Sequence, residues 1–539
     1  MPKERPVKQV GGIGIDRIEI VYPSVVITAD VLAKGIEKIT GKKYDVEKIR
    51  RGIGVEEIRW PSYSESNITM AAEALYNLLY KIATNEEDWD KLKRQPLKAI
   101  GFHTESGTDW SSTDLTMAIC LAQSLLATST PEDRYNKIRD MLEGAMPVPV
   151  TFACAGGGIS INDLVLQVKN ANGRGSAILV GADTSVYEES RAEDAQVTEG
   201  SAAHASWITS SPSLVRVHRE GLVGVDHQPE DGFRKFGKPT PTTHKRGSQI
   251  MFHAGTTNAR RRLETALNAY GESIYDGLEA IVSHTPHKGE PELLATQVFK
   301  DYYKLKKPDR WAKIEEEIGK EPLPEGISDF GELVKARRDK ASQIGVKPSK
   351  LSDYVSECEE IIAYQEWLRK LKSHPECIEF RKEKHVPESL VKHSVSGNSY
   401  SVAWINSLTS LILNMPDERL DMDDAAKILL NKFGSSSVSL VTVLYVVATA
   451  DDKRERIGIK DTPRYVMADP DDYGPLHAFL STEADERMVG RDLVALNQAM
   501  LKGQPVPNSI HIKTADDRGN MEFVRVDENG KVEDIQLRY

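Results

Sequence analysis

The sequence is short of cysteine and of long apolar runs. Its 539 residues include only four cysteines, Cys120, Cys154, Cys358 and Cys377, with no CxxC pair and no Cys/His cluster at zinc spacing. Four thiols in so long a chain do not make a disulfide framework or a structural zinc site, although one of them can be reactive. The longest uncharged apolar run, near 438–450, is well short of the roughly 20 residues that cross a bilayer, so no membrane span is expected.

An excess of positive charge is also absent. The chain has 70 Lys and Arg against 81 Asp and Glu, a net charge of -11, which disfavours a protein that binds nucleic acid by neutralising phosphates. Residues 1–7 are charged and lack the apolar core of a signal peptide, so we expect a cytoplasmic protein. With 40% apolar and 28% charged residues, the chain is expected to be globular, either as about three domains or as two fused halves with insertions.

Strand and helix patterns alternate along the first half. The expected elements are a strand at 13–21, a helix at 71–82, a strand at 99–102 and a helix at 115–127. A strand end (VPVTFA) then leads into Cys154, followed by small residues (AGGG), a helix (ISINDLVLQVKNA) and a buried strand (SAILVGAD). Alternation of this kind predicts a layered α/β architecture.

The second half repeats this plan around a different central segment. A strand at 278–283, a helix at 401–413 and a strand at 437–448 predict the same α/β plan used a second time. Between them, 300–386 is dense in charge and is expected to be a helical surface insertion, either simply solvated or docking a partner. The tail, 508–539, alternates polar and apolar residues around a Glu-Asn-Gly turn and predicts a small β-hairpin.

Cys154 is the thiol in the most reactive setting. At the first turn of a buried helix it would face the positive end of the helix dipole, which favours the thiolate. The three following glycines leave room for a substrate and let backbone amides approach a thioester carbonyl. The simpler interpretation is a small packed residue, which is how we interpret the other three cysteines.

Four further side chains are candidates for chemistry. His284 ends a strand in the loop SHTPHKGEP, where His287 competes for the same role. Asn398, in VSGNSYS, either caps a helix or presents its amide to a carbonyl oxygen. Glu105, in GFHTESGTDWSS, follows a strand and is either a solvated carboxylate or, in a dry cleft, a base with a raised pKa. Glu65 is a weaker candidate, because a helix dipole explains a charge just before a helix.

Taken in order, these segments resemble the hydroxymethylglutaryl-CoA synthases of archaea and bacteria, within the thiolase superfamily. The resemblance covers roughly residues 10–300 and 390–470. It rests on ordered motifs: GIGIDRIEIVYPS, GIGVEEIRWPSYSESNITMAAEAL, HTESGTDWS, FACAGGGISINDLVLQVKNANGRGSAILVGADTSVY, TEGSAAHASWI, SHTPHKGEP, SGNSYSVAWINSLTSLI and KFGSSSV.

The resemblance implies a fold and a domain plan. The fold is the duplicated, layered αβαβα arrangement of the thiolases, with a charged helical insertion in the second half and a small β-rich C-terminal tail. The implied units are an N-terminal half, 1–212, that carries the nucleophile, a C-terminal half, 213–475, that carries the histidine and asparagine, and an extension, 476–539. The insertion would occupy about 300–390.

It also implies a reaction. In this family a cysteine, matched by Cys154, takes the acetyl group of acetyl-CoA. A glutamate, matched by Glu105, removes a methyl proton so that the enolate attacks acetoacetyl-CoA. The acceptor is polarised by a histidine, matched by His284, with help from an asparagine, matched by Asn398. Water then hydrolyses the enzyme thioester, so coenzyme A thioesters are substrates and neither a resident cofactor nor a metal is implied.

The sequence departs from the family where coenzyme A is expected to bind. Lys288 follows His284 by four positions, whereas the family lysine follows by five, and the usual Gly-Ser-Gly turn reads Gly434, Ser435, Ser436. We therefore expect Lys288, Gly434 and Ser435 at the substrate site, with the acceptor more open to change than the nucleophile.

A standard biosynthetic thiolase is disfavoured, because it needs a second catalytic cysteine near the C-terminus and none follows Cys377. Three other functions stay open. A type III ketoacyl synthase uses the same Cys, His and Asn but needs no base such as Glu105. A synthase-like thiolase would act on another acyl-CoA with an OB-fold partner protein, and a non-catalytic scaffold would not need the four site residues. By analogy we expect a homodimer, with an OB-fold protein and a thiolase as candidate partners.

Overall fold

The computed structural model describes residues 12–106, 111–187, 196–227, 232–234, 241–243, 245–347, 350–434, 438–461, 465–481, 491–500, 509–515 and 521–537. Within these residues one large sheet runs through the molecule in the order β12-β13-β14-β8-β1-β7-β6-β4-β5, with β15 beside β1 and β9 beside β14. Its N-terminal strands are β1 (Gly14–Tyr22), β4 (Leu97–Thr104), β5 (Met146–Thr151), β6 (Ser176–Ser185) and β7 (Gly200–Thr209). Its C-terminal strands are β8 (Val215–Val217), β9 (Gly224–His227), β12 (Leu278–Ser283), β13 (Ala426–Gly434), β14 (Val438–Val446) and β15 (Ile457–Asp461).

The two halves of this sheet share one strand order. In the first half β4 pairs parallel with β6, β6 pairs antiparallel with β7, and β7 pairs antiparallel with β1. In the second half β12 pairs parallel with β13, β13 pairs antiparallel with β14, and β14 pairs antiparallel with β8 and β9. The predicted duplication of the α/β plan is therefore confirmed.

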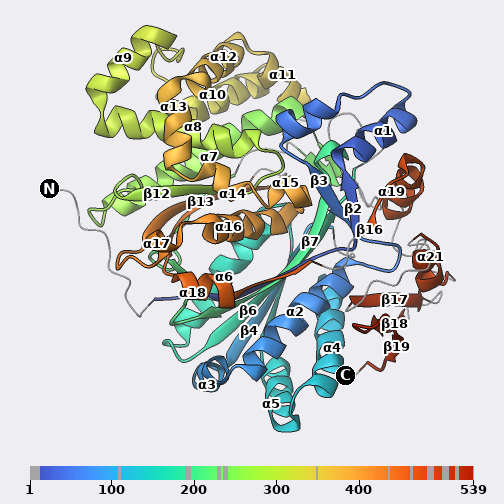
Figure 1. Cartoon of the computed structure of the whole chain (residues 1–539). Coiled ribbons are helices and arrows are strands. Elements are labelled where there is room, and N and C mark those ends of the chain that lie inside the picture. The colour runs from blue at the N-terminus through green and yellow to red at the C-terminus, as the bar shows by residue number, and fades with distance from the viewer. Residues whose placement is uncertain are drawn as a thin grey trace.

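Helices cover the sheet halves in layers because strand side chains alternate between two buried faces. Ile18 and Ile20 of β1 join a core with helices α6 (Gly156–Asn170) and α16 (Ala403–Asn414), whereas Val21 joins the core on the other face. Figure 1 shows α6 and α16 near the middle of the molecule. Helices α2 (Asn67–Thr84) and α4 (Ser111–Ser129) cover the first half, and α7 (Lys245–Asn268) and α8 (Gly289–Lys306) the second. This is the predicted αβαβα layering.

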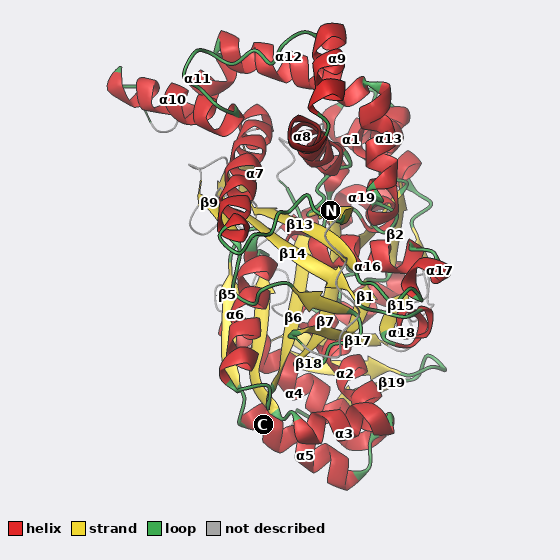
Figure 2. Ribbon diagram, turned by 90° about the vertical axis from the view of Figure 1, so that its left-hand side faces the viewer, coloured by secondary structure: helices red, strands yellow, loops and turns green. Residues whose placement is uncertain are grey.

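The charged insertion is helical, as predicted, and its inner faces extend the core. It contains α9 (Pro308–Ile318), α10 (Phe330–Gln343), α11 (Leu351–Glu357), α12 (Glu359–Ser373) and α13 (Pro375–Glu383). Trp311, Phe330 and Trp367 are buried in the same cluster as apolar residues of α7 and α8. Figure 2 shows these helices gathered at one end of the molecule, away from the C-terminal strands.

The tail forms the predicted hairpin, which a third strand extends into a three-stranded antiparallel sheet. The Glu-Asn-Gly turn joins β18 (Met521–Val526) to β19 (Val532–Ile535), and β17 (Ser509–Ala515) pairs with β18 on its other side. Ile510, Ile512 and Phe523 pack into the core beside α2 and α4. The domain boundaries at 212 and 475 stay predictions.

Shorter elements complete the described fold. They are β2 (Val25–Thr28), α1 (Ala29–Thr40), β3 (Glu57–Trp60), α3 (Glu86–Arg94), α5 (Glu132–Glu143), β10 (Gly232–Arg234), β11 (Pro241–Thr243), α14 (Val386–Ser389), α15 (His393–Ser396), α17 (Asp417–Leu420), α18 (Ala450–Glu455), β16 (Tyr465–Val466), α19 (Tyr473–Ser481) and α21 (Leu493–Met500).

Candidate active site

The site begins where the parallel strands of the first half end. Glu105 directly follows β4, Cys154 lies between β5 and α6, and Asp183 lies near the end of β6. Because β4 pairs parallel with both β5 and β6, the carboxyl ends of these strands meet at one edge of the sheet. Residues far apart in the sequence are thereby brought together.

Cys154 and Glu105 are in direct contact. The thiol is 6% exposed, and its Sγ donates a hydrogen bond to Oε2 of Glu105 over 3.0 Å. Burial, followed by the charge of Glu105, raises the pKa of Cys154 well above its usual value. The predicted thiolate is therefore wrong. Burial and the Glu105 carboxylate raise the thiol pKa by more than the positive end of the α6 dipole lowers it. The pair is instead a protonated nucleophile beside an acceptor for its proton.

Asp183 fixes the backbone around this pair. One carboxylate oxygen accepts hydrogen bonds from the backbone nitrogen of Glu105 at 2.7 Å and from that of Ser106 at 2.9 Å. Its other oxygen accepts from the backbone nitrogen of Ser401 at 3.0 Å. Asp183 thus ties the Glu105 loop to the start of α16. Sequence reasoning missed it, although an acidic residue at the end of the apolar run SAILVGAD was a signal.

Asn398 belongs to the second half but is bonded to the first. It is 1% exposed; its backbone nitrogen donates to the Thr198 carbonyl at 2.9 Å, and its own carbonyl accepts from Ser185 Oγ at 2.7 Å. Its side-chain oxygen accepts from the backbone nitrogen of Tyr400 at 3.0 Å, so it supports the turn before α16. It does not cap α16 itself, whose cap residue is Val402. Tyr400 has a φ of 42°, an uncommon conformation for an aromatic residue.

Two tyrosines that sequence reasoning missed lie beside the thiol. The rings of Tyr187 and Tyr400 meet edge to face with centroids 5.9 Å apart. Desolvation, and then the nearby negative groups, raises the pKa of both hydroxyls well above its usual value, and Cys154 and Glu105 are among those groups. Both tyrosines therefore stay protonated and can act as neutral hydrogen-bond donors.

His284 occupies the equivalent strand end in the second half. It follows β12, is 2% exposed, and its Nδ1 has no hydrogen-bond partner among the residues that the structure describes. Burial, followed by the nearby His393 and His287, lowers the pKa of His284 to about 3. The ring is neutral, so it can donate one hydrogen bond to a substrate oxygen.

Among the described residues, the His284 loop makes no direct bond to the nucleophile. In the described part of the chain no hydrogen bond joins His284 to Cys154, Glu105 or Asn398. Glu290, in the first turn of α8 just after that loop, is one of the charges that raise the pKa of Cys154. The structure therefore joins Cys154 directly to Glu105, positions Asn398 through the adjoining loops, and brings the start of α8 close enough to act electrostatically.

The predicted substrate-binding residues are only partly defined. Lys288 stands just before α8, where its backbone nitrogen donates to the Ile53 carbonyl at 2.9 Å and its side chain lies against Gly54. Gly434 is the last residue of β13, and Ser435 lies outside the described residues.

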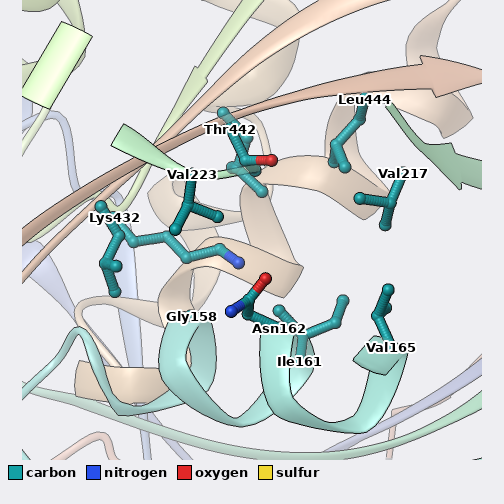
Figure 3. Close-up of a pocket in the computed structure, with 11 residues that line it drawn as sticks. Gly158, Ile161, Asn162, Val165, Val217, Val223, Lys432, Thr442 and Leu444 are labelled. Carbon is teal, nitrogen blue, oxygen red and sulfur yellow. The ribbon is translucent and has the colours of Figure 1, made fainter. Parts of the chain in front are cut away.

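Behind the first turn of α6 a buried lysine fills a small apolar pocket. Figure 3 shows the Lys432 amine reaching in beside Asn162 and below Thr442. Its Nζ lies 4.1 Å from the centre of the Trp404 ring, and desolvation lowers the pKa of Lys432 to about 7. This lysine packs against the helix that begins at the nucleophile.

The donor set suits acyl transfer. In the described ranges, no three His, Cys, Asp or Glu side chains are grouped as metal ligands. Nor does any helix in those ranges have the length and apolar character to cross a membrane. A thiol beside a carboxylate, with neutral histidine and tyrosine donors nearby, can form a thioester and stabilise a developing oxyanion.

Comparison with known proteins supports this chemistry. No protein-family model matches the sequence. The chain is 24% identical over 451 residues to the hydroxymethylglutaryl-CoA synthase of Haloferax volcanii. The aligned region covers 83% of this chain and 87% of that protein.

Solved structures give the same result for the fold. MvaS in complex with 3-hydroxy-3-methylglutaryl coenzyme A has a TM-score of 0.59 at 16% identity, with 96% of this chain and 100% of that chain covered. The HMG synthase of the curacin biosynthetic pathway, in complex with holo donor-ACP, has a TM-score of 0.61 at 13% identity, with 95% and 99% covered. PksG, an HMG-CoA synthase from Bacillus subtilis, has a TM-score of 0.57 at 13% identity, also with 95% and 99% covered. The resemblance predicted from the ordered motifs is confirmed.

Proposed function

We propose that this chain, a homologue of the hydroxymethylglutaryl-CoA synthases with their thiolase-like fold, condenses acetyl-CoA with acetoacetyl-CoA and releases hydroxymethylglutaryl-CoA. The observation that carries the proposal is the 3.0 Å hydrogen bond from the Cys154 thiol to Glu105. It puts a nucleophile suited to thioesters in contact with a base suited to removing a proton from carbon.

The first step is acetyl transfer. The Cys154 proton passes to Glu105 as Sγ attacks the acetyl-CoA carbonyl, and the tetrahedral intermediate then expels coenzyme A. The proton on Glu105 passes to the departing coenzyme A sulfur, so Glu105 is a carboxylate again before the next step. Because the thiol is protonated in the resting site, Glu105 must accept its proton as the new S–C bond forms.

The second step forms the carbon–carbon bond. Glu105 removes a proton from the acetyl methyl group, and the enolate carbon attacks the ketone of acetoacetyl-CoA. The neutral His284 ring and the Asn398 amide are the proposed hydrogen-bond donors to the alkoxide that forms from the ketone oxygen. The alkoxide becomes a hydroxyl by taking up the proton that Glu105 removed, which returns Glu105 to the carboxylate. Water finally cleaves the thioester to Cys154, giving a free carboxylate and restoring the thiol.

Contact with Glu105 favours this reaction over that of a type III ketoacyl synthase. A decarboxylating condensation generates its carbanion by losing carbon dioxide and needs no base beside the nucleophile, whereas proton removal from acetyl does. The close pairing of Glu105 with Cys154 is unexplained in the decarboxylating alternative.

Further parts of the proposal concern binding and assembly. Lys288, Gly434 and Ser435 would contact coenzyme A, and the protein would act in the cytoplasm as a homodimer, with an OB-fold protein and a thiolase as partners. Complexes of relatives with coenzyme A, with hydroxymethylglutaryl-CoA and with acyl carrier protein support thioester substrates for this chain.

The test is to identify the acyl group and its product. Incubation with radioactive acetyl-CoA followed by peptide mapping should label the peptide that contains Cys154, and Cys154→Ala should abolish the label. Cys120→Ala removes another buried thiol and should keep it. Adding acetoacetyl-CoA should release coenzyme A and hydroxymethylglutaryl-CoA; turnover of malonyl thioesters alone would overturn the proposal.

A further inference from the structure

Two buried histidines form a hydrogen-bond chain behind the proposed active site. His103 lies on β4 and His204 on β7, and their Nε2 atoms are 2.8 Å apart. Nδ1 of His103 is 2.8 Å from the hydroxyl of Ser401, which in turn bonds to the Asp183 carboxylate. Nδ1 of His204 is 3.0 Å from the hydroxyl of Ser206. All five residues are 0% exposed, and neither histidine has a role in the proposed reaction.

A glycine lets the two rings meet. In the sheet, His103 pairs with Gly181 of β6, and Gly181 pairs with His204 on its other side. Residues paired across neighbouring strands point to the same face of a sheet, so both rings lie over Gly181. A Cβ there would be 2.2 Å from Nε2 of His103 and 2.8 Å from Nε2 of His204. The contact between the rings therefore depends on a position without a side chain.

Asp183 gives the chain a direction. Three backbone nitrogens, those of Glu105, Ser106 and Ser401, donate to its oxygens. A backbone nitrogen cannot accept, so these contacts suit a carboxylate. Burial raises the pKa of Asp183, and the hydrogen bond from the Ser401 hydroxyl opposes that rise most strongly. Because this hydroxyl gives its hydrogen to Asp183, its oxygen is left to accept one from Nδ1 of His103.

The neutral rings carry the same direction on to His204. Burial lowers the pKa of His204 to about 3, and burial, followed by the nearby His204 and Lys432, lowers the pKa of His103 well below its usual value. With its hydrogen on Nδ1, the neutral His103 ring has a bare Nε2, which accepts from Nε2 of His204. Nδ1 of His204 then accepts from the Ser206 hydroxyl. Every hydrogen of the chain is thus directed toward Asp183.

We propose that His103 and His204 are positioning residues for the proposed reaction. They keep the Ser401 hydroxyl turned toward Asp183, and Asp183 in turn holds the backbone of the Glu105 loop. The assignment rests on the proposed function, because the proton transfers of Glu105 are what require a fixed loop. Polar rings cost more to bury than apolar side chains, whereas a buried network with its hydrogen bonds satisfied imposes one arrangement on its members.

The tautomers of the two rings test the chain without any substrate. In protein made with isotope-labelled histidine, NMR distinguishes the protonated from the bare nitrogen of a neutral ring. His103 should carry its hydrogen on Nδ1 and His204 on Nε2. The variants His103→Asn and His204→Gln assign the signals, since each removes one ring. A hydrogen on Nε2 of His103 would mean that Ser401 donates to the ring and not to Asp183, and would overturn the proposal.

Replacement of His204 tests the consequence for the rate. His204→Leu removes the donor that fixes the tautomer of His103, so the Ser401 hydroxyl can turn away from Asp183. The kcat of condensation should fall by about tenfold or more, because small displacements of a reacting group are costly. The KM for acetoacetyl-CoA should be unchanged, since both rings are fully buried.

His204→Gln is the conservative variant. Its amide nitrogen is as many bonds from Cβ as Nε2 of histidine, so it can still donate to His103 and should restore most of the lost kcat. An unchanged kcat in His204→Leu would overturn the positioning role. The same conclusion would follow from equal losses in the leucine and glutamine variants, or from a change in KM alone.

His218→Leu is the matched control. His218 is bonded to Glu272 over 2.7 Å beside β8, outside the chain, so its loss removes a histidine hydrogen bond elsewhere and should leave kcat unchanged. A kcat that follows the melting temperature across all three variants would mean a general loss of stability and would overturn the proposal. If the unmodified protein made no hydroxymethylglutaryl-CoA, the proposed function would fail. The tautomers would still decide on the chain, and Cys154 acetylation, in which Glu105 also accepts a proton, would supply the rates.

Discussion

The Glu105 side chain controls the protonation of the nucleophile beside it. After burial, the negative charge of Glu105 is the largest cause of the raised Cys154 pKa. Glu105→Gln removes that charge, so the thiol pKa should fall toward its usual value. The rate of iodoacetamide alkylation at Cys154, followed by mass spectrometry across pH, should then reach half its maximum at lower pH than in the unmodified protein.

The alkylation experiment needs a control for charge elsewhere. Glu143→Gln changes an exposed carboxylate at the end of α5 and should leave the profile in place. A profile for Glu105→Gln that is unmoved, or displaced to higher pH, would mean that burial alone sets the Cys154 pKa. The condensation step should be lost in Glu105→Gln in either case, because an amide cannot take up the methyl proton.

Asp183 should matter for folding as well as for the site. Its two oxygens accept from the backbone of Glu105, Ser106 and Ser401, all in a buried setting. Asp183→Asn turns one acceptor into a donor that faces other donors, so the free energy of unfolding should fall by about 3 kcal/mol or more. Urea denaturation measures this loss. Asp90→Asn, at an exposed carboxylate paired with Lys93, should change it little.

At the scale of elements, the approach of α6 to α16 depends on a glycine. A Cβ added at Gly157 would lie 2.2 Å from Nε1 of Trp404 and 2.8 Å from the Ser401 carbonyl oxygen, so α16 would have to move. Gly157→Ala should therefore destabilise the protein by about 1–3 kcal/mol and reduce acetyl transfer, since Cys154 lies just before the start of α6. Thermal unfolding and the labelling assay measure the two effects.

The neighbouring glycine supplies the comparison. At Gly156 the nearest atom to an added Cβ is Cβ of Phe152 at 3.4 Å, an ordinary contact. Gly156→Ala should cost little, because alanine also favours the helix. Equal destabilisation by the two substitutions would point to a general intolerance of side chains in this turn, and not to the contact with Trp404.

Apolar elements were predictable from the sequence, and an element carrying buried charge was not. The strand at 278–283 was predicted with the bounds that the structure shows. The neighbouring β13 was missed because Lys427 and Lys432 interrupt its apolar pattern. Both are buried: Lys427 donates to the Ser273 carbonyl at 2.6 Å, and Lys432 lies over the Trp404 ring. Only tertiary contacts make a lysine acceptable there.

The site was predictable to the same extent. Cys154 and Glu105 could be singled out because strand ends and small residues mark them locally. Tyr187 could not, because its role arises from packing between segments distant in the sequence. Asp183 ends an apolar run, but that signal alone does not show that it joins the Glu105 loop to Ser401. The ionisation of Cys154 was predicted with the wrong sign because local reasoning counts the helix dipole but not the depth of burial.

At the scale of the whole molecule, the exposed edge of the large sheet bears on the proposed homodimer. Strand β5 pairs with β4 alone and is largely exposed, with Met146 56% exposed. The backbone nitrogen of Phe152 donates to Thr104 of β4. Peptide groups alternate between the two edges of a strand, so Pro147 and Pro149 face outward. Proline has no amide hydrogen, so two backbone hydrogen-bond donors are absent from the outer edge of β5. Their absence opposes pairing of β5 with a strand of a second copy of the chain.

The proposed homodimer should accordingly rely on side-chain packing. Restoring the two backbone amide donors that Pro147 and Pro149 lack should strengthen self-association. Pro147→Thr with Pro149→Thr adds two amide hydrogens to a strand edge that already presents carbonyl groups, so the dimer should persist at lower protein concentration or grow into larger assemblies. Light scattering after gel filtration across a dilution series measures this. Pro131→Ala, beside the start of α5, is the control and should leave assembly unchanged. If the double variant dissociates at the same concentration as the unmodified protein, the two prolines are not what limits pairing at this edge.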